Sequence, residues 1–317
     1  MLRGLRVLAA VILLGLLAYG VDWQSMPDYA AGLSWPPALL AAAGLTAQFV
    51  VSPWKWQWAL RLHDLYFGLP YLVRANGVGF FFNNFLPSAI GGDAYRVMST
   101  WPEDGYRSRA VSAVLVERIV GFAALLAIGN VGALWLSLRT ENRFAAIFVL
   151  SSVACAAVAI GVLWAIHSGW LRPLADRVRD TRMFAIVSHN IGCLARAGRL
   201  WLPLTGISLL FQALAIVNIY LLFLALGAPV SWAACAMIGA VAGLASVIPL
   251  SINGIGVVEG SFAGTAVALG VDYEPALTVA VLIRLLVLPP SVVFGVLYAL
   301  GGGNRVTERQ PRAAELP

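Results

Sequence analysis

Amide, hydroxyl and charged side chains interrupt an apolar stretch of the sequence, FFFNNFLPSAIGGDAYR. Amide and hydroxyl groups can hydrogen-bond either a ligand or a free backbone group. Asp93 and Arg96 are three residues apart, so they share one face of a helix. The alternative is a loop end that carries a surface ion pair. The candidate binding residues in this stretch are Asn83, Asn84, Ser88, Gly91, Gly92, Asp93 and Arg96.

The same stretch predicts an interrupted helix. Pro87 lacks an amide hydrogen and Gly91-Gly92 tolerate a tight backbone, so the helix through Phe80–Phe85 is expected to break near Pro87. A break frees backbone groups that hydrocarbon cannot satisfy, and broken helices at membrane depth occur only inside protein or beside a wet cavity. This favours the lining of a binding site over a surface loop.

A second stretch, SVIPLSINGIGVVEG, has a similar order of residues. Ser251, Asn253 and Glu259 are its candidate binding residues. Aligned on proline, few positions match the first stretch, and the acid is shifted by four. Two interrupted helices in opposite halves resemble transporters whose discontinuous helices meet at the bilayer midplane. Gly254-x-Gly256 does not predict a dinucleotide loop, because no strand precedes it.

Three further charged residues lie inside apolar runs: Glu117 and Arg118 in VLVERIVG, and Arg284 in VAVLIRLLVLPP. Adjacent helical residues point about 100° apart, so Glu117 and Arg118 each need a partner from another helix. Arg284 is the best candidate to meet Glu117 or Glu259. Structural ion pairing, binding of an anionic headgroup and proton coupling all remain open for these residues, and an arginine fork suits a phosphate.

These charges are costly at membrane depth. One charge at the centre of a span costs roughly 2.5–3.5 kcal/mol, so six isolated ones would cost about 15 kcal/mol. The set contains three acids and three arginines, as an internal ion-pair network would require. Its members are Asp93, Arg96, Glu117, Arg118, Glu259 and Arg284.

Composition fixes the class of protein. The chain has 317 residues, of which 60% are hydrophobic and 11% charged, less than half the charged share of ordinary globular proteins. The runs that exceed the length needed to cross a bilayer are 110–138, 144–167, 201–226 and 276–300. The sequence therefore predicts an all-α polytopic membrane protein.

Basic residues in the connections predict orientation. The arginine-rich segment 168–200 and Arg3 and Arg6 are expected in the cytoplasm, and parity then makes 75–90 a re-entrant segment. The result is eight spans plus one re-entrant helix, with both termini cytoplasmic. Residues 232–271 are counted as two spans, although a second re-entrant hairpin fits the charges equally well.

We expect one transmembrane domain over residues 1–300, including a basic amphipathic helix at 168–200, and a disordered cytoplasmic tail at 301–317. The net charge of +6 lies in short connections, which indicates anionic lipid heads and not nucleic acid. The cysteines and histidines have no metal-ligand spacing. Neither a metal nor a cofactor is expected.

The order NNFLPSAIGGDAYR, VERIVG, PLSINGIGVVEG and a final-span arginine resembles the lysylphosphatidylglycerol synthase transmembrane, or flippase-like, family. Some members are the flippase half of bacterial enzymes that make and translocate aminoacylated phosphatidylglycerol. Others stand alone and are linked to polyprenyl-lipid, glycan or hopanoid pathways. Without an aminoacyltransferase domain, this chain is expected to be a stand-alone member that does not synthesise lysyl-lipid. The resemblance implies signature residues at Asn84, Pro87, Ser88, Gly91, Gly92, Asp93, Arg96, Glu117, Arg118, Pro249, Ser251, Gly254, Gly256 and Glu259.

The leading hypothesis is a non-enzymatic transporter in the bacterial inner membrane for a lipid or lipid-linked anionic headgroup (phospholipid, polyprenyl-linked or hopanoid-type). The head would follow a polar path while the tails stay in the bilayer. No ATP-binding loop is present, so movement would be passive or driven by protons or membrane potential through Asp93 or Glu259. One alternative is a non-transporting partner of an envelope-lipid enzyme. The other is a membrane-embedded headgroup transferase, although no catalytic triad, HxxxxD or DxD motif supports it.

Overall fold

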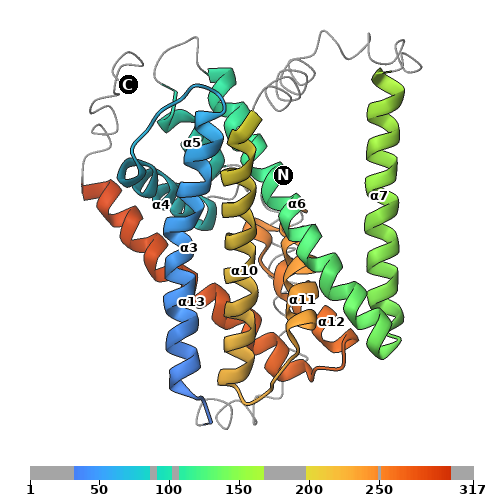
Figure 1. Ribbon diagram of the computed structural model, residues 1–317. Helices are drawn as coiled ribbons and strands as arrows, with labels where there is room; N and C mark the ends of the chain where they lie inside the picture. The colour runs from blue at the N-terminus through green and yellow to red at the C-terminus, as the bar shows by residue number, and fades with distance from the viewer. Residues whose placement is uncertain (1–31, 86–90, 102–106, 168–197, 249–250, 301–317) are drawn as a thin grey trace.

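The computed structural model describes residues 32–85, 91–101, 107–167, 198–248 and 251–300. The predicted first span, most of the basic amphipathic segment, the C-terminal tail and Ser88 lie outside the described residues. Within that part the chain is entirely helical, with nine α-helices and two short 3-10 helices (Figure 1). They are α3 (Trp35–Arg61), α4 (Leu69–Phe85), α5 (Gly91–Ser99), α6 (Arg107–Thr140), α7 (Arg143–His167), η1 (Gly198–Leu200), α10 (Trp201–Ala225), α11 (Trp232–Ala245), η2 (Ile252–Gly254), α12 (Val257–Ala268) and α13 (Tyr273–Leu300).

Long apolar helices confirm the predicted class of protein. Four described segments are long and apolar enough to cross a membrane: α3, α6, η1 with α10, and α13. They have 27 to 34 residues, and about 20 suffice for a hydrocarbon core of about 30 Å. The predicted runs at 110–138 and 276–300 agree with α6 and α13 to within three residues at each end.

Two pairs of shorter helices accompany the long ones. α4 and α5 have 17 and 9 residues, and α11 and α12 have 14 and 12. At 1.5 Å per residue, α11 and α12 are about 21 and 18 Å long, which is less than the thickness of a hydrocarbon core. Each of them is thus shorter than the two full spans counted for 232–271. α4 starts earlier than the predicted segment 75–90 and ends at Phe85, just before the expected break.

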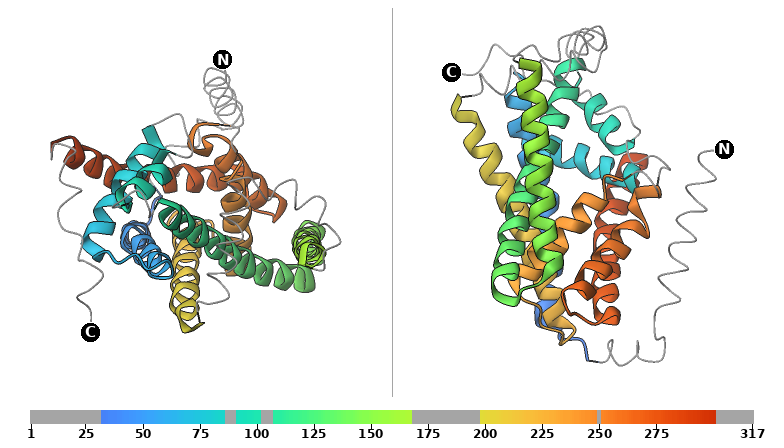
Figure 2. Two further views of the ribbon diagram at one scale, coloured as in Figure 1. Left: turned by 90° about the horizontal axis from the view of Figure 1, so that it is seen from above. Right: turned by 90° about the vertical axis from the view of Figure 1, so that its right-hand side faces the viewer.

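The short pairs lie toward opposite ends of the long helices. In Figure 1, α4 and α5 lie in the upper part of the bundle, and α11 and α12 lie in the lower part. The right-hand view of Figure 2 shows the same separation. α3 packs along α10, while α13 crosses obliquely and contacts both α12 and α4. α13 therefore contacts a member of each short pair, as α6 also does through α11 and α5.

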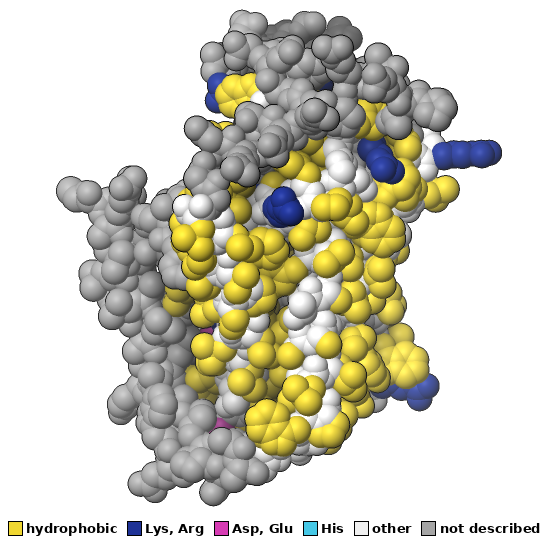
Figure 3. All heavy atoms as spheres, turned by 90° about the vertical axis from the view of Figure 1, so that its left-hand side faces the viewer, with side chains coloured by type: hydrophobic (Ala, Val, Ile, Leu, Met, Phe, Trp, Pro, Cys, Tyr) yellow, Lys and Arg dark blue, Asp and Glu magenta, His cyan; other side chains and the backbone are white. Residues whose placement is uncertain are grey.

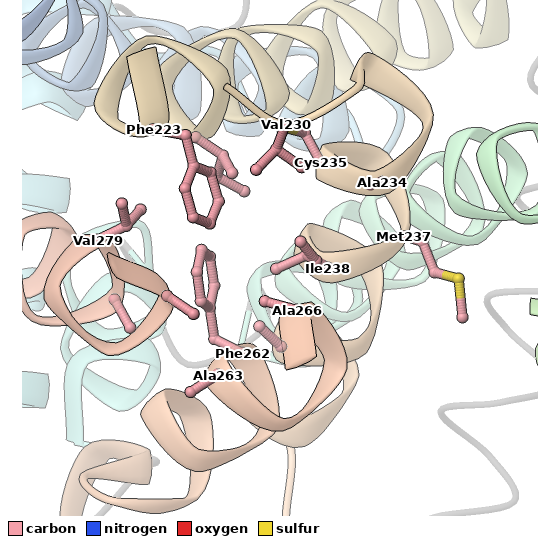
Figure 4. Packing of buried hydrophobic residues seen from close by; sticks show 14 of the residues in the cluster. Phe223, Val230, Ala234, Cys235, Met237, Ile238, Phe262, Ala263, Ala266 and Val279 are labelled. Atoms are coloured by element: carbon pink, nitrogen blue, oxygen red, sulfur yellow. The ribbon is translucent and has the colours of Figure 1, made fainter. Parts of the chain in front are cut away.

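Small and aromatic residues together form the core beside α11 and α12. The rings of Phe223 and Phe262 stack with their centroids 6.0 Å apart (Figure 4). On α6, a side chain at Gly132 would collide with the carbonyl of Ala233 on α11. Small residues let helix backbones approach closely in membranes, where van der Waals packing drives helix association.

The outer surface suits an apolar solvent. Figure 3 shows one face on which hydrophobic side chains form a broad band, with basic side chains toward its ends. Large aliphatic side chains of the described helices are strongly exposed, including Leu138 of α6 at 74% and Leu202 of α10 at 73%. Exposure on this scale marks a surface that contacts another apolar phase, as a membrane-spanning bundle does.

Candidate functional site

One buried carboxylate joins three helices. Glu117 of α6 binds Lys55 of α3 through Oε1, with 2.6 Å to Nζ. Its Oε2 accepts a hydrogen bond from Nη2 of Arg96 of α5 at 2.7 Å. All three side chains are buried. Both carboxylate oxygens are therefore occupied. The partners come from other helices, as the sequence predicted, and they are Lys55 and Arg96 and not Arg284.

A second carboxylate extends the network. Asp93 Oδ1 lies 3.5 Å from Nη1 of Arg96, and the two residues share one face of α5, as predicted. Its Oδ2 binds Nη2 of Arg118 on α6. We call Lys55, Asp93, Arg96, Glu117 and Arg118 the charged network. Three cations against two carboxylates leave it with one excess positive charge.

Close contact between α4 and α5 positions Arg96. A side chain at Gly92 would collide with the carbonyl of Gly79 on α4, so glycine is required there. The Gly92 amide donates to Oδ1 of Asn83 at 2.8 Å, and Gly91 begins the helix. The Arg96 guanidinium also lies over the Trp56 ring, 4.4 Å from its centroid. Packing and charge therefore both hold this arginine.

The charged network lines a cavity of about 180 Å³ between α3, α4, α5, α6 and α10. Its lining joins predicted residues, namely Asn83, Asp93, Arg96, Glu117 and Arg118, to others that the sequence did not single out. The added polar residues are Ser52, Lys55, Asn76 and Gln212. The structure thus brings five of the thirteen predicted residues together around one cavity.

Lys55 is the main site residue that the sequence analysis did not single out. Its exposed fraction is only 6%, and α3 continues beyond it to Arg61. Gly121 leaves space for it, because a Cβ at that position would lie 3.1 Å from Lys55 Nζ. A single lysine between tryptophans within an apolar helix was the available signal.

Asn84 and Asn253 form a separate joint. Nδ2 of Asn253 donates to Oδ1 of Asn84 at 2.5 Å, and Nδ2 of Asn84 donates to Oγ of Ser291 at 3.0 Å. These bonds connect α4, η2 and α13. Asn253 has a positive φ of 49°, a conformation that asparagine tolerates better than most residues. We call Asn84, Asn253 and Ser291 the amide joint.

Glu259 and Arg284 pair with each other, which confirms one of the two predicted partners of Arg284. Glu259 Oε1 binds Nε of Arg284, and Oε2 accepts from the Gly256 amide at 2.7 Å at the start of α12. The pair ties α12 to α13, and neither residue lines the cavity of the charged network. Ser251 is buried, and its hydroxyl has no hydrogen-bond partner among the described residues.

These features define a polytopic α-helical membrane protein with a buried, predominantly cationic site. The chain belongs to the family described as the lysylphosphatidylglycerol synthase TM region, whose model matches residues 4–295. This match confirms the resemblance carried by the sequence motifs, and the family indicates a membrane protein related to the handling of lipid headgroups. No curated protein matched the sequence.

Proposed function

We propose that this protein moves a lipid with an anionic headgroup across the membrane. The observation that supports this most directly is the charged network, in which cations outnumber carboxylates at a cavity within an apolar bundle. The Arg118 side chain is 41% exposed, so the excess positive charge lies at the accessible side of the cavity, where it can attract an anionic group. One anionic group in the cavity would neutralise the excess.

The arginines offer free donors to such a group. Nε of Arg96 and Nε of Arg118 are buried and have no hydrogen-bond partner within the described ranges. A guanidinium presents its donors in a fork that matches a phosphate with two bonds. Arg96 Nη1 lies 3.5 Å from Asp93, a longer contact than its 2.7 Å bond to Glu117. A phosphate would therefore displace Asp93 from the Arg96 guanidinium more readily than it would displace Glu117 from it.

The arrangement of the short helices suggests the path of the headgroup. We propose that α4–α5 and α11–α12 are re-entrant pairs that approach the middle of the membrane from opposite sides. The amide joint connects these two pairs. Transporters with discontinuous helices in both halves bind their substrates at such a junction. The head would cross there, driven by protons or membrane potential through Asp93, or passively, with no covalent chemistry.

The expected location is the bacterial inner membrane, with an anionic lipid as the partner molecule. A non-transporting partner of an envelope-lipid enzyme is the competing function. Such a scaffold would use the charged network for folding and would neither retain a particular lipid nor move one.

The first test compares lipids that co-purify with the wild type and with Arg96→Ala, identified by mass spectrometry. We expect an anionic lipid to be enriched on the wild type and lost on the variant. Arg139→Ala is the matched control, because Arg139 is an exposed arginine at the end of α6. Thermal unfolding must first show that each variant is folded.

The second test measures flipping directly. Proteoliposomes would contain phosphatidylglycerol with a fluorescent headgroup, and an impermeant quencher would report on lipid in the outer leaflet. Wild-type protein should expose lipid from the inner leaflet faster than Arg96→Ala. The transporter proposal would be wrong if the wild type and Arg96→Ala retained the same lipids and gave the same rate of quenching. The scaffold function would then be favoured.

A further inference from the structure

A second cavity lies beside the cavity of the charged network and has the opposite character. Its volume is about 340 Å³, and α6, α10, α11, α12 and α13 contribute its walls. Small side chains such as Ala215, Gly239 and Ala242 leave the space open, and Ile216 and Phe262 add larger apolar surface. Cavities of this size and lining are typical of sites for apolar ligands.

Both polar side chains of this second cavity donate hydrogen bonds to backbone carbonyls. Only Gln212 and Ser246 among its lining residues carry polar side chains. The Ser246 hydroxyl donates to the Gly243 carbonyl at 2.6 Å, and Gln212 Nε2 donates to the Gly121 carbonyl at 3.2 Å. The walls therefore offer a ligand mainly hydrocarbon contact.

The two cavities share part of their lining. Phe122 and Gln212 line both of them. Gly121, whose carbonyl accepts the bond from Gln212, also lines the charged cavity. The charged cavity and the apolar cavity thus meet at Phe122 and Gln212. A lipid, with a charged head and an apolar chain, would need two such cavities side by side.

We propose that the apolar cavity binds a hydrocarbon chain of the same lipid whose anionic group enters the charged network. This inference rests on the proposed function, and it replaces the expectation that all tails remain in the bilayer. It also limits the substrate to a lipid with a flexible linear chain, either an acyl chain or a polyprenyl chain.

The ion pair between Glu259 and Arg284 acquires a positioning role in this arrangement. Val258 and Ile283, the residues just before each of them, line the apolar cavity. The pair joins α12 to α13 and so fixes two walls of the cavity relative to each other. These two charges would shape the chain site without touching the headgroup.

Photolabelling tests the proposal on the intact protein. The probe is phosphatidylglycerol with a diazirine on one acyl chain, and phosphatidylcholine with the same group reports on bulk lipid. We expect the phosphatidylglycerol probe to label peptides around Ile216 and Phe262 in competition with unlabelled phosphatidylglycerol. Equal labelling by both probes, unaffected by competitor, would mean that only bulk lipid enters the cavity.

A matched pair of substitutions separates the cavity from the outer surface. Ala215→Phe fills the cavity, whereas Ala213→Phe makes the same change at an exposed position of α10. Excluding two methylene groups should weaken phosphatidylglycerol binding about tenfold, and the control should bind normally. Normal binding by a folded Ala215→Phe variant would overturn the proposal. If this variant fails to fold, the photolabelling of the wild type still tests whether phosphatidylglycerol chains enter the apolar cavity.

Arg96→Ala distinguishes failure of this inference from failure of the proposed function. Loss of lipid retention on that variant, combined with labels outside the cavity, would overturn the chain site and leave the headgroup site intact. Labels inside the cavity that persist on Arg96→Ala and are equal for both probes would overturn the headgroup site. A long-chain polyprenyl phosphate as competitor then shows which of the two chain types the cavity prefers.

Discussion

The two interrupted regions of the chain use similar residues in different ways. Near α4–α5, Arg96 shares two carboxylates with two other cations around a cavity. Near α11–α12, Glu259 has one cationic partner and one backbone donor, and its pair is balanced. Both regions contain buried charge, and only the network near α4–α5 has unequal numbers of opposite charges. The proposed headgroup site therefore rests on that inequality at a polar cavity and not on buried charge alone.

The largest expected effect is that of Glu117→Gln. It leaves Lys55 and Arg96 facing each other in a buried site without the carboxylate that separates them. Breaking a buried ion pair by removing one partner costs about 3–5 kcal/mol, and we expect the free energy of unfolding to fall by that amount. Steric trapping in bicelles measures the free energy of unfolding of the wild type and of the variant.

Glu141→Gln is the control for this change, because Glu141 is exposed at the turn between α6 and α7. A loss of stability at Glu117 no larger than that of the control would mean that water reaches the network freely. The assignment of the charged network as a buried site would then be wrong.

Glu259→Gln should have a smaller effect. Its glutamine oxygen can still accept the bond from the Gly256 amide, and Arg284 is one-quarter exposed and can be hydrated. The loss is that of one charge-assisted hydrogen bond, about 1.5–3 kcal/mol. The same unfolding measurement should therefore rank it below Glu117→Gln.

Lipid selectivity sharpens this contrast between the regions. In Glu259→Gln, preference for phosphatidylglycerol over phosphatidylcholine should persist, because Glu259 does not line the charged cavity. Loss of that preference in a folded Glu259→Gln protein would place the headgroup nearer to α12 than proposed.

The sequence predicted the class of fold because hydrophobic length leaves few options. It also predicted that Asp93 and Arg96 share a helix face and that Arg284 meets Glu117 or Glu259, since unpaired charges are too costly in an apolar bundle. It did not single out Lys55, because a basic residue near the end of an apolar run is usually an interfacial anchor and not a buried charge. The border formed by Phe122 and Gln212 was not predictable either, because it depends on which helix faces meet.

The amide joint should show the smallest effect, measurable only as a coupling. Asn84 and Asn253 contact each other through one hydrogen bond, so a double-mutant cycle with Asn84→Ala and Asn253→Ala isolates it. Interhelical hydrogen bonds in membranes average about 0.6 kcal/mol, and we expect coupling of that size in the free energy of unfolding. If the joint also connects two moving halves of a transporter, the flipping rate should show coupling between the same two positions. Coupling in stability with strict additivity in rate would make the joint a fixed contact, and the headgroup path would then have to open elsewhere.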